Sequence, residues 1–462
     1  MSLDKYLRRP DSEVVIKEGK YEKYNLRENP FPSSPFVNPH SSDPRSNGDI
    51  YETSIRNQEY SLLSKNFLEV PQTDPNHLRF GYIIDTSYIG RGNGKSAFLI
   101  NLQKKINADF AFSVSNGQNR CFAFTMVPEA GGKTKTFEKF VDLFAQGIFD
   151  SDIINDSLAT LRLEAILAVY STFNIEEHFK NEGDIREKLN SINWFSTNKI
   201  DAKRVNDHVI SNKYLQNLPS DFPVYSKGLF TLDLVNQDTF KEYYLNLKRG
   251  KFRIEFVFSH LVSLFLAAGF TGAYVFVDDF ERIPDFQSER QKRDFALELR
   301  TCMFDGLNTN AKIGFYELIL VLHAGVPRLI QSAWDQSGLE QRAPIFFNGT
   351  PKHVIRFEKI TLEDTYSLLL KYLHEYRINQ TSTDELSPFT KAAVMKMAEL
   401  GEFNTSKILK LAYETLERAV DGNITTIDAD FIVVDESAEL GEQRRVSDIY
   451  DAPTKNLMRE SE

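Results

Sequence analysis

The sequence predicts an α/β protein in which a doubly wound parallel sheet forms the core and a small helical domain follows it. Two observations support this fold class. Four short apolar runs, rich in β-branched and aromatic residues, alternate with segments of helical spacing, as the buried strands of a parallel sheet do. Beyond residue 355 the pattern changes to helical stripes with apolar residues on one face. The predicted strands are residues 80–85, 121–127, 273–277 and 318–322.

Composition limits the class of protein. With 462 residues, 41% hydrophobic and 26% charged, the chain has material for two or three globular units. No apolar stretch is long enough to span a bilayer, so no membrane partner is expected. Cys121 and Cys302 lie among apolar neighbours, which suits a reduced compartment and predicts a cytoplasmic location. The net charge of −10 argues against a generally basic nucleic-acid-binding surface but permits a local positive one.

The pattern divides the chain into successive parts. The first part is rich in Pro, Ser, Asn and charged residues and cannot build a core of its own, so we expect an extended arm. Within the core we expect an inserted helical region whose polar stretch, residues 181–221, is irregular. Thr361 and Asp364 have the spacing of a capping box at the start of the terminal helical domain. The expected parts are an arm (1–50), a core (51–355) with an insertion at about 135–270, a helical domain (356–436) and a tail (437–462).

A glycine-rich loop follows the first predicted strand. A phosphate chain needs closely spaced backbone N–H groups, a cation and a hydroxyl for magnesium; the loop glycines, Lys95 and Ser96 supply these in that order. The helix predicted over 97–106 directs its N-terminal dipole at the same phosphates. The segment therefore predicts a P-loop that binds ATP and Mg²⁺. Its expected binding residues are Gly90, Arg91, Gly92, Asn93, Gly94, Lys95, Ser96 and Ala97.

The loop departs from the usual spacing in one respect. The first glycine of a P-loop stands five positions before Gly94, where this chain has Ile89. Either the opening turn is built differently, or Gly90 serves in a tighter loop.

Two acidic residues end the third predicted strand. Carboxyl ends of central parallel strands face the crevice where ligands bind, so we assign Asp278, together with Ser96, to Mg²⁺. Asp279 stands where a water-activating Glu is common, and its shorter side chain predicts slow hydrolysis. Glu281 is a second candidate base, with pairing to Arg282 as the alternative.

Taken together, these motifs resemble AAA+ ATPases of the origin-recognition-complex-like branch, over about residues 25–425. Within that branch, the segment from Glu298 to Asp305 and the Gly325-Val326-Pro327 turn are most similar to bacterial ATPases of anti-phage systems such as BREX. The motifs that carry the resemblance are Asn29-Pro30-Phe31, the Lys95-Ser96 loop, Val277-Asp278-Asp279-Phe280-Glu281-Arg282, the strand ending Leu322-His323-Ala324-Gly325-Val326-Pro327, and the terminal helices.

The resemblance implies a P-loop NTPase core with a helical lid, and roles for several residues. His323 would be the polar sensor that orients the attacking water, with a purely structural histidine as the alternative. Arg342 would be the arginine finger that reaches a neighbouring subunit, with Arg328 as competitor. Pro30 and Phe31 would contact the adenine, unless the arm simply packs against the protein.

The resemblance also implies a function. It is that of an ATP-driven switch in a DNA-associated process, with defence against foreign DNA as the specific version and replication initiation or transposition close behind. Protein partners, a homo-oligomer and DNA, bound directly or through a partner, are its expected partners. The lid of such proteins usually offers an arginine to the nucleotide; here Lys407 either substitutes for it, or that sensor is absent.

A second function class stays open. Ile89, the short Asp279 side chain and the missing lid arginine all favour a regulatory module that holds ATP with little or no turnover. A nucleotide-dependent kinase is disfavoured, because no acceptor pocket is recognisable in the sequence.

Overall fold

The computed structural model describes residues 19–35, 37–38, 41–86, 92–226, 235–345, 352–380 and 385–433. The chain divides into two compact units. The first, called here the sheet unit, comprises Asn57–Tyr88 and Phe98–Glu358. The second, called the helical unit, comprises Met1–Arg56, Ile89–Ala97 and Lys359–Glu462. None of the helices in the described ranges combines the length and the apolar character needed to cross a membrane.

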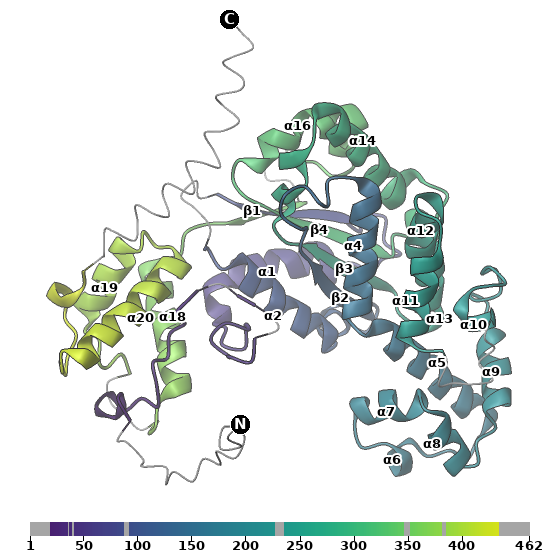
Figure 1. The fold of residues 1–462 in the computed structure, drawn as a ribbon, viewed down its shortest axis with the longest axis horizontal. Helices are drawn as coiled ribbons and strands as arrows, with labels where there is room; N and C mark the ends of the chain where they lie inside the picture. Colours follow the sequence, from purple (N-terminus) through teal and green to yellow (C-terminus); the bar gives the residue numbers. More distant parts are fainter. Residues whose placement is uncertain are drawn as a thin grey trace, which may run out of the picture. The chain divides into compact units, whose positions relative to one another are not determined.

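A five-stranded parallel sheet forms the centre of the sheet unit (Figure 1), so the predicted α/β class and parallel sheet are confirmed. The strand order is β2-β3-β4-β1-β5. The predicted strands correspond to β1, β2, β3 and β4, whereas the edge strand β5 was not predicted. The strands are β1 (Phe80–Asp85), β2 (Cys121–Met126), β3 (Gly272–Val277), β4 (Tyr316–Leu322) and β5 (Val354–Phe357).

One face of the sheet is packed by aromatic side chains from α4 (Phe137–Asp150) and the helical segment 251–267. Phe144 of α4 contacts Phe124 of β2 and Tyr316 of β4, with ring centroids 5.4 and 4.9 Å apart. On the same face, the Tyr82 hydroxyl of β1 accepts a hydrogen bond from the Trp334 indole of α16 (Val326–Ser337). Because these rings are almost fully buried, they remove a large apolar area from water.

The opposite face of the sheet is covered by α1 (Asn57–Leu63), the π-helical turn η4 (Ser64–Leu68) and α2 (Lys95–Asn107). The Asn107 side chain of α2 hydrogen-bonds both the carbonyl and the amide of Ala123 in β2. On β1, a Cβ atom at Gly81 would overlap the ring of Phe67, so only glycine permits this close approach. Both faces of the sheet are therefore buried, which explains why the four longer strands are continuous apolar runs.

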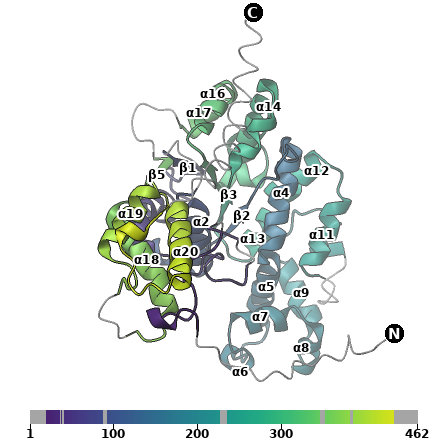
Figure 2. The ribbon, with the colours of Figure 1, turned by 60° about the vertical axis from the view of Figure 1, so that its left-hand side comes forward.

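The region between β2 and β3 is helical, and its polar stretch differs from the expectation. Residues 181–221, expected to be irregular, contain α7, α8 and α9, which form a lobe beside α5 in both ribbon views (Figures 1 and 2). The stretch folds because side chains such as Phe195 and Val205 are fully buried, while Asn181 and Asp201 cap α7 and α9. The helices of this region are α4, α5 (Ile153–Val169), α6 (Ile175–His178), α7 (Glu182–Leu189), α8 (Ile192–Thr197), α9 (Ala202–Ile210), α10 (Pro223–Ser226), α11 (Gln237–Asn246), α12 (Lys251–Glu255), η6 (Phe256–His260) and α13 (Leu261–Ala267).

Shorter elements connect the remaining strands of the sheet unit. They are α3 (Phe110–Val114) before β2, η7 (Phe280–Arg282), η8 (Pro284–Phe286), α14 (Glu289–Arg300), η9 (Thr301–Asp305) and α15 (Thr309–Ile313) between β3 and β4, and α16 and α17 (Leu339–Arg342) after β4.

The helical unit is built on α18 (Leu362–Tyr376), α19 (Lys391–Leu400) and α20 (Thr405–Asp421) (Figure 2). The predicted capping box is confirmed, since the Thr361 side chain accepts from the Asp364 amide and the Asp364 side chain accepts from the Thr361 amide. The described part of residues 19–50, expected to be an arm, packs against these helices. Its apolar side chains complete the core of these helices, with Phe31 fully buried beside Tyr372 and Phe389. The unit also contains the short turns η2 (Glu22–Tyr24), η3 (Thr53–Arg56) and η10 (Ala429–Phe431).

A buried ionisable pair joins the segment before β1 to β4. The His77 Nε2 atom lies 2.8 Å from a carboxylate oxygen of Glu317, and the Gln72 amide donates to the same oxygen. Burial raises the pKa of Glu317, and His77 partly offsets this. Burial alone would lower the pKa of His77, but the hydrogen bond and charge of Glu317 outweigh it, so this pKa is raised. The side chains are 3% and 0% exposed, so breaking the pair should be costly.

We expect His77→Asn to lower the free energy of unfolding by about 3 kcal/mol, because it removes one partner of a buried pair.

A group whose pKa is raised in the folded state contributes stability that is present below the unfolded pKa and is lost as pH rises through the folded pKa. This holds for both His77 and Glu317. The wild type should therefore lose stability relative to Glu317→Gln, which removes the ionisable carboxyl, as pH rises above the ordinary His pKa of 6.5. Thermal unfolding of both proteins between pH 6 and 9 measures this, and a constant difference in melting temperature would contradict it.

Candidate functional site

The described part of the glycine-rich loop has the backbone geometry that its glycines predict. Gly92 and Gly94 have φ angles of +116° and +79°, which residues with a Cβ adopt only under strain. Lys95 and Ser96 are the first two residues of α2, the helix that follows β1 in the chain. The loop glycines are thus required by conformation, and two side chains of the phosphate-binding pattern stand at a helix N-terminus. Ile89, Gly90 and Arg91 lie outside the described residues.

The loop is held in the helical unit by the start of α20. The Ser406 amide donates to the Gly92 carbonyl at 3.0 Å, and the Asn404 side-chain amide lies 3.3 Å from the Asn93 side-chain oxygen. Arg56, the last residue of the unit's first chain segment, donates to the Asn93 carbonyl at 2.9 Å. Asn404 also caps α20, because its side-chain oxygen accepts a hydrogen bond from the Lys407 amide at 3.2 Å.

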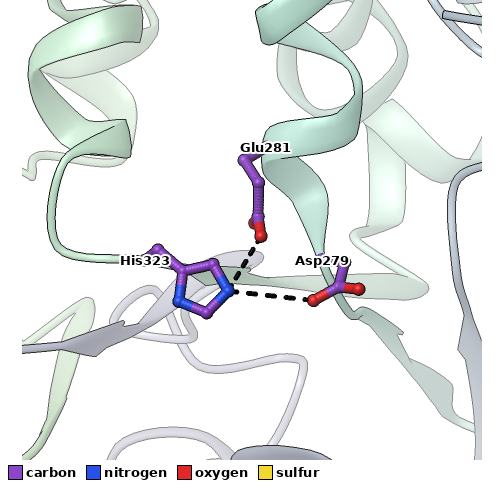
Figure 3. Close-up of side chains that lie close together, drawn as sticks. All are labelled: Asp279, Glu281 and His323. Carbon is purple, nitrogen blue, oxygen red and sulfur yellow. Dashed lines mark ion pairs between the residues drawn. The ribbon is translucent and has the colours of Figure 1, made fainter. Parts of the chain in front are cut away.

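The acidic residues after β3 and the histidine after β4 form one cluster, which is called the Asp-Glu-His cluster here (Figure 3). The Nε2 atom of His323 lies 2.9 Å from Oε1 of Glu281 and 3.9 Å from Oδ1 of Asp279. The side chains of Asp279, Glu281 and His323 are 22%, 8% and 13% exposed. The sequence predicted each of the three as a site residue, and the structure shows that they contact one another.

Sheet register explains why these three residues meet. Strands β3 and β4 are adjacent and parallel, with Val277 opposite Leu320. Asp279 comes two residues after Val277, and His323 comes three residues after Leu320. Both therefore lie at the same edge of the sheet. Asp279 then has a left-handed backbone, with φ of +49°, and begins the tight turn η7 that carries Glu281. The cluster thus follows from strand order and one unusual turn residue.

An arginine orients one member of the cluster. Arg282 donates to Oδ2 of Asp279 and also, at 3.1 Å, to the carbonyl of Pro128. The sequence left pairing of Arg282 with Glu281 open; the structure pairs it with Asp279, while Glu281 faces His323. Since Arg282 occupies Oδ2, Oδ1 is the oxygen of Asp279 that faces His323.

Asp278 lies outside this cluster. It is buried, and its Oδ1 atom accepts a hydrogen bond from the Asp279 amide at 3.0 Å. Its own amide donates to the Met126 carbonyl of β2, continuing the sheet by one residue. The residue expected to serve magnesium therefore stands at the carboxyl end of β3, and its carboxylate accepts from the following amide.

The candidate residues from the family resemblance have varied surroundings. Arg342, at the end of α17, is 54% exposed and pairs with Asp305 at 3.2 Å, whereas Arg328 on α16 is exposed. Lys407 pairs with Glu402 at 3.0 Å. Pro30 and Phe31 are buried in the helical unit, as expected if the arm packs against the protein. For Phe31 to contact an adenine, its ring would have to leave that core.

Comparison of the chain with protein-family models, curated proteins and solved structures found no match.

The contact between the loop and α20 can be tested at Gly92. A Cβ atom there would lie 2.6 Å from the Asn404 side-chain oxygen and 2.7 Å from the Ser406 Cβ. We expect Gly92→Ala to release the Ser406 amide, which should then exchange with solvent at least tenfold faster in a hydrogen-exchange experiment. Gly131→Ala is the matched control: its φ is +74° but a Cβ would meet nothing within 4 Å, so it should cost only about 1 kcal/mol of backbone strain. Equal exchange at Ser406 in the two variants would refute the contact.

Proposed function

We propose that the protein is a P-loop ATP-binding switch of the AAA+ type, with slow ATP hydrolysis. One observation carries the proposal: a strand of a parallel sheet is followed by a loop with glycines at positive φ, and then by a helix whose first two residues are Lys95 and Ser96. Backbone amides without Cβ atoms, a lysine and a hydroxyl in this order form the pattern that recognises a nucleotide triphosphate with its metal.

The sheet supports this proposal through its topology. Strands β1 and β4 are neighbours, but β1 connects toward β2 at one edge and β4 connects toward β5 at the other. Right-handed crossovers in opposite directions place the following helices on opposite faces, and α/β proteins commonly bind ligands outside the carboxyl ends of two strands that diverge in this way. The loop with Lys95 leaves from β1 and His323 follows β4. In chain order, the two candidate segments therefore follow the two strands at which α/β proteins commonly bind ligands.

Magnesium would be held by the Ser96 hydroxyl and the Asp278 carboxylate. Both are oxygen ligands of the kind Mg²⁺ prefers, and Asp278 stands directly after β3, with its carboxylate accepting from the following amide. In such a site the ion neutralises charge on the phosphates.

Slow hydrolysis is expected because the groups that would activate water are constrained. Asp279 has a short side chain, and Arg282 pairs with one of its two carboxylate oxygens. Glu281 is the longer carboxylate and lies 2.9 Å from His323, which could orient it. We therefore assign the role of base to Glu281 in preference to Asp279, with His323 as a positioning residue.

The helical unit would act as the lid. Because the start of α20 bonds to Gly92 and Asn93, a change in loop conformation on phosphate binding would displace this helix. A process on DNA, such as defence against foreign DNA, follows from the family resemblance alone, as do a homo-oligomer and protein partners.

The second candidate, a regulatory module that holds ATP without turnover, has its own observation. Lys407, the possible replacement for the lid arginine, is paired with Glu402, and Asp279 is paired with Arg282. Both groups would have to exchange partners before acting on a nucleotide.

ATP binding is tested at Lys95. We expect Lys95→Ala to weaken ATP·Mg binding by roughly 10- to 100-fold, because it removes a charge-assisted contact of about 1.5–3 kcal/mol. Lys104→Ala, an exposed lysine on the same helix, is the control and should bind as the wild type does. Isothermal titration calorimetry measures both, and equal affinities for the two variants would contradict the proposed site.

Oligomer-dependent hydrolysis is tested by measuring ATP turnover at increasing protein concentration, with and without DNA. If Arg342 acts on a neighbouring subunit, specific activity should rise with concentration, and Arg342→Ala should lower the plateau at least tenfold. Arg328→Ala is the matched control on the preceding helix and should retain the rise. A loss in Arg328→Ala but not in Arg342→Ala would assign the finger to Arg328.

Absence of turnover in the wild type despite tight ATP binding would favour the regulatory module.

A further inference from the structure

We propose that Asp279, Glu281 and His323 form a binding site for a divalent transition-metal ion of the Zn²⁺ type, separate from the magnesium expected at Ser96 and Asp278. One ligand atom from each of the three residues lies within 4.8 Å of the other two. The inference concerns binding of the ion to the nucleotide-free protein and does not rest on ATP binding. While the ion is bound, Glu281 is its ligand and does not serve as the base proposed above.

The distances suit a small tetrahedral ion. Zinc binds imidazole nitrogen and carboxylate oxygen at about 2.0–2.2 Å, so two ligands of a tetrahedral site are about 3.4 Å apart. The Nε2 atom of His323 is 2.9 Å from Oε1 of Glu281 and 3.9 Å from Oδ1 of Asp279, values that bracket this separation. The two carboxylate oxygens lie within 4.8 Å of each other, so the ion would have to draw the Asp279 and Glu281 side chains together on binding.

The surroundings also suit a metal ion. Glu281 and His323 are largely buried, while the Asp279 side chain is 22% exposed and therefore in contact with solvent. In Figure 3, the three side chains converge from two adjacent chain segments, one after β3 and one after β4. Arg282 binds the outer oxygen of Asp279 and is itself held by Pro128, as groups outside a metal's ligand shell commonly orient a ligating carboxylate.

The ligand set decides the class of ion. An imidazole nitrogen is a poor ligand for Mg²⁺, which prefers six oxygens in octahedral geometry. One imidazole with two carboxylates suits Zn²⁺ and its neighbours in the first transition row, and Zn²⁺ should bind more tightly than Mn²⁺. Three protein ligands would leave a fourth position for water.

The test is a titration of the full-length protein, freed of metal with a chelator and containing no nucleotide. Zn²⁺ is followed by calorimetry and Co²⁺ by its visible absorption. We expect one tight site per chain, a tetrahedral Co²⁺ spectrum, and retention of Zn²⁺ in millimolar Mg²⁺. Glu281→Gln and His323→Gln should each weaken binding at least 100-fold, and Arg282→Gln by about 10- to 100-fold. His208→Gln, at an exposed histidine on α9, should leave the affinity unchanged.

Circular dichroism verifies that each variant is folded, and Asp279→Asn replaces any variant that is not. The proposal is overturned if Zn²⁺ and Co²⁺ bind no more tightly than Mg²⁺, or if Glu281→Gln and His323→Gln keep the wild-type affinity. It is also overturned if the Co²⁺ spectrum shows thiolate ligation, since that would place the ion at a cysteine. Because no nucleotide is present, failure of ATP binding in a separate experiment would not alter the result.

Discussion

Parallel pairing of β3 with β4 is the constraint on which the candidate chemistry depends. The register that sets Val277 opposite Leu320 brings the residues following both strands to one edge of the sheet. There the left-handed Asp279 turns the chain so that Glu281 faces His323, and Arg282 fixes the remaining oxygen of Asp279. A shift in register would separate the imidazole from both carboxylates. Burial of both faces of the sheet by aromatic and aliphatic side chains is what makes such a shift costly.

Gly92 has an equally constrained role in the helical unit. Its φ of +116° requires glycine, and the space where a Cβ would stand is filled by Asn404 and Ser406. The same residue therefore serves the proposed phosphate-binding loop and permits the close approach of α20. In the proposed switch this is the physical link between nucleotide and lid. A backbone hydrogen bond here would transmit movement even though no arginine stands at the start of α20.

The sequence predicted the elements whose pattern reflects their own burial. Strand β1 is confirmed at both ends, because a run of apolar residues between polar ones is recognisable without any partner. Strand β5 was missed since it has four residues, lies at the edge of the sheet and exposes Arg356. Phe31 was placed in an arm because its burial depends on helices more than 300 residues later in the chain. Helices α7–α9 were missed because their polar faces dilute the few buried residues.

The candidate site was predictable as a set of residues but not as a geometry. Their place after a buried strand identified Asp279 and Glu281, and the family resemblance suggested His323, whereas their contact depends on register and on a tight turn. In that turn, residues three apart lie on the same side, so Arg282 reaches Asp279 rather than its direct neighbour Glu281.

Hydrogen exchange with and without ATP·Mg tests the central claim most directly, because it locates the nucleotide along the chain. If the segment from Gly92 to Ser96 cradles the phosphates, its amides should gain protection of at least tenfold when ATP·Mg binds, and that of Ser406 should change with them. Binding of ATP that leaves the Gly92–Ser96 amides unaffected would contradict the account.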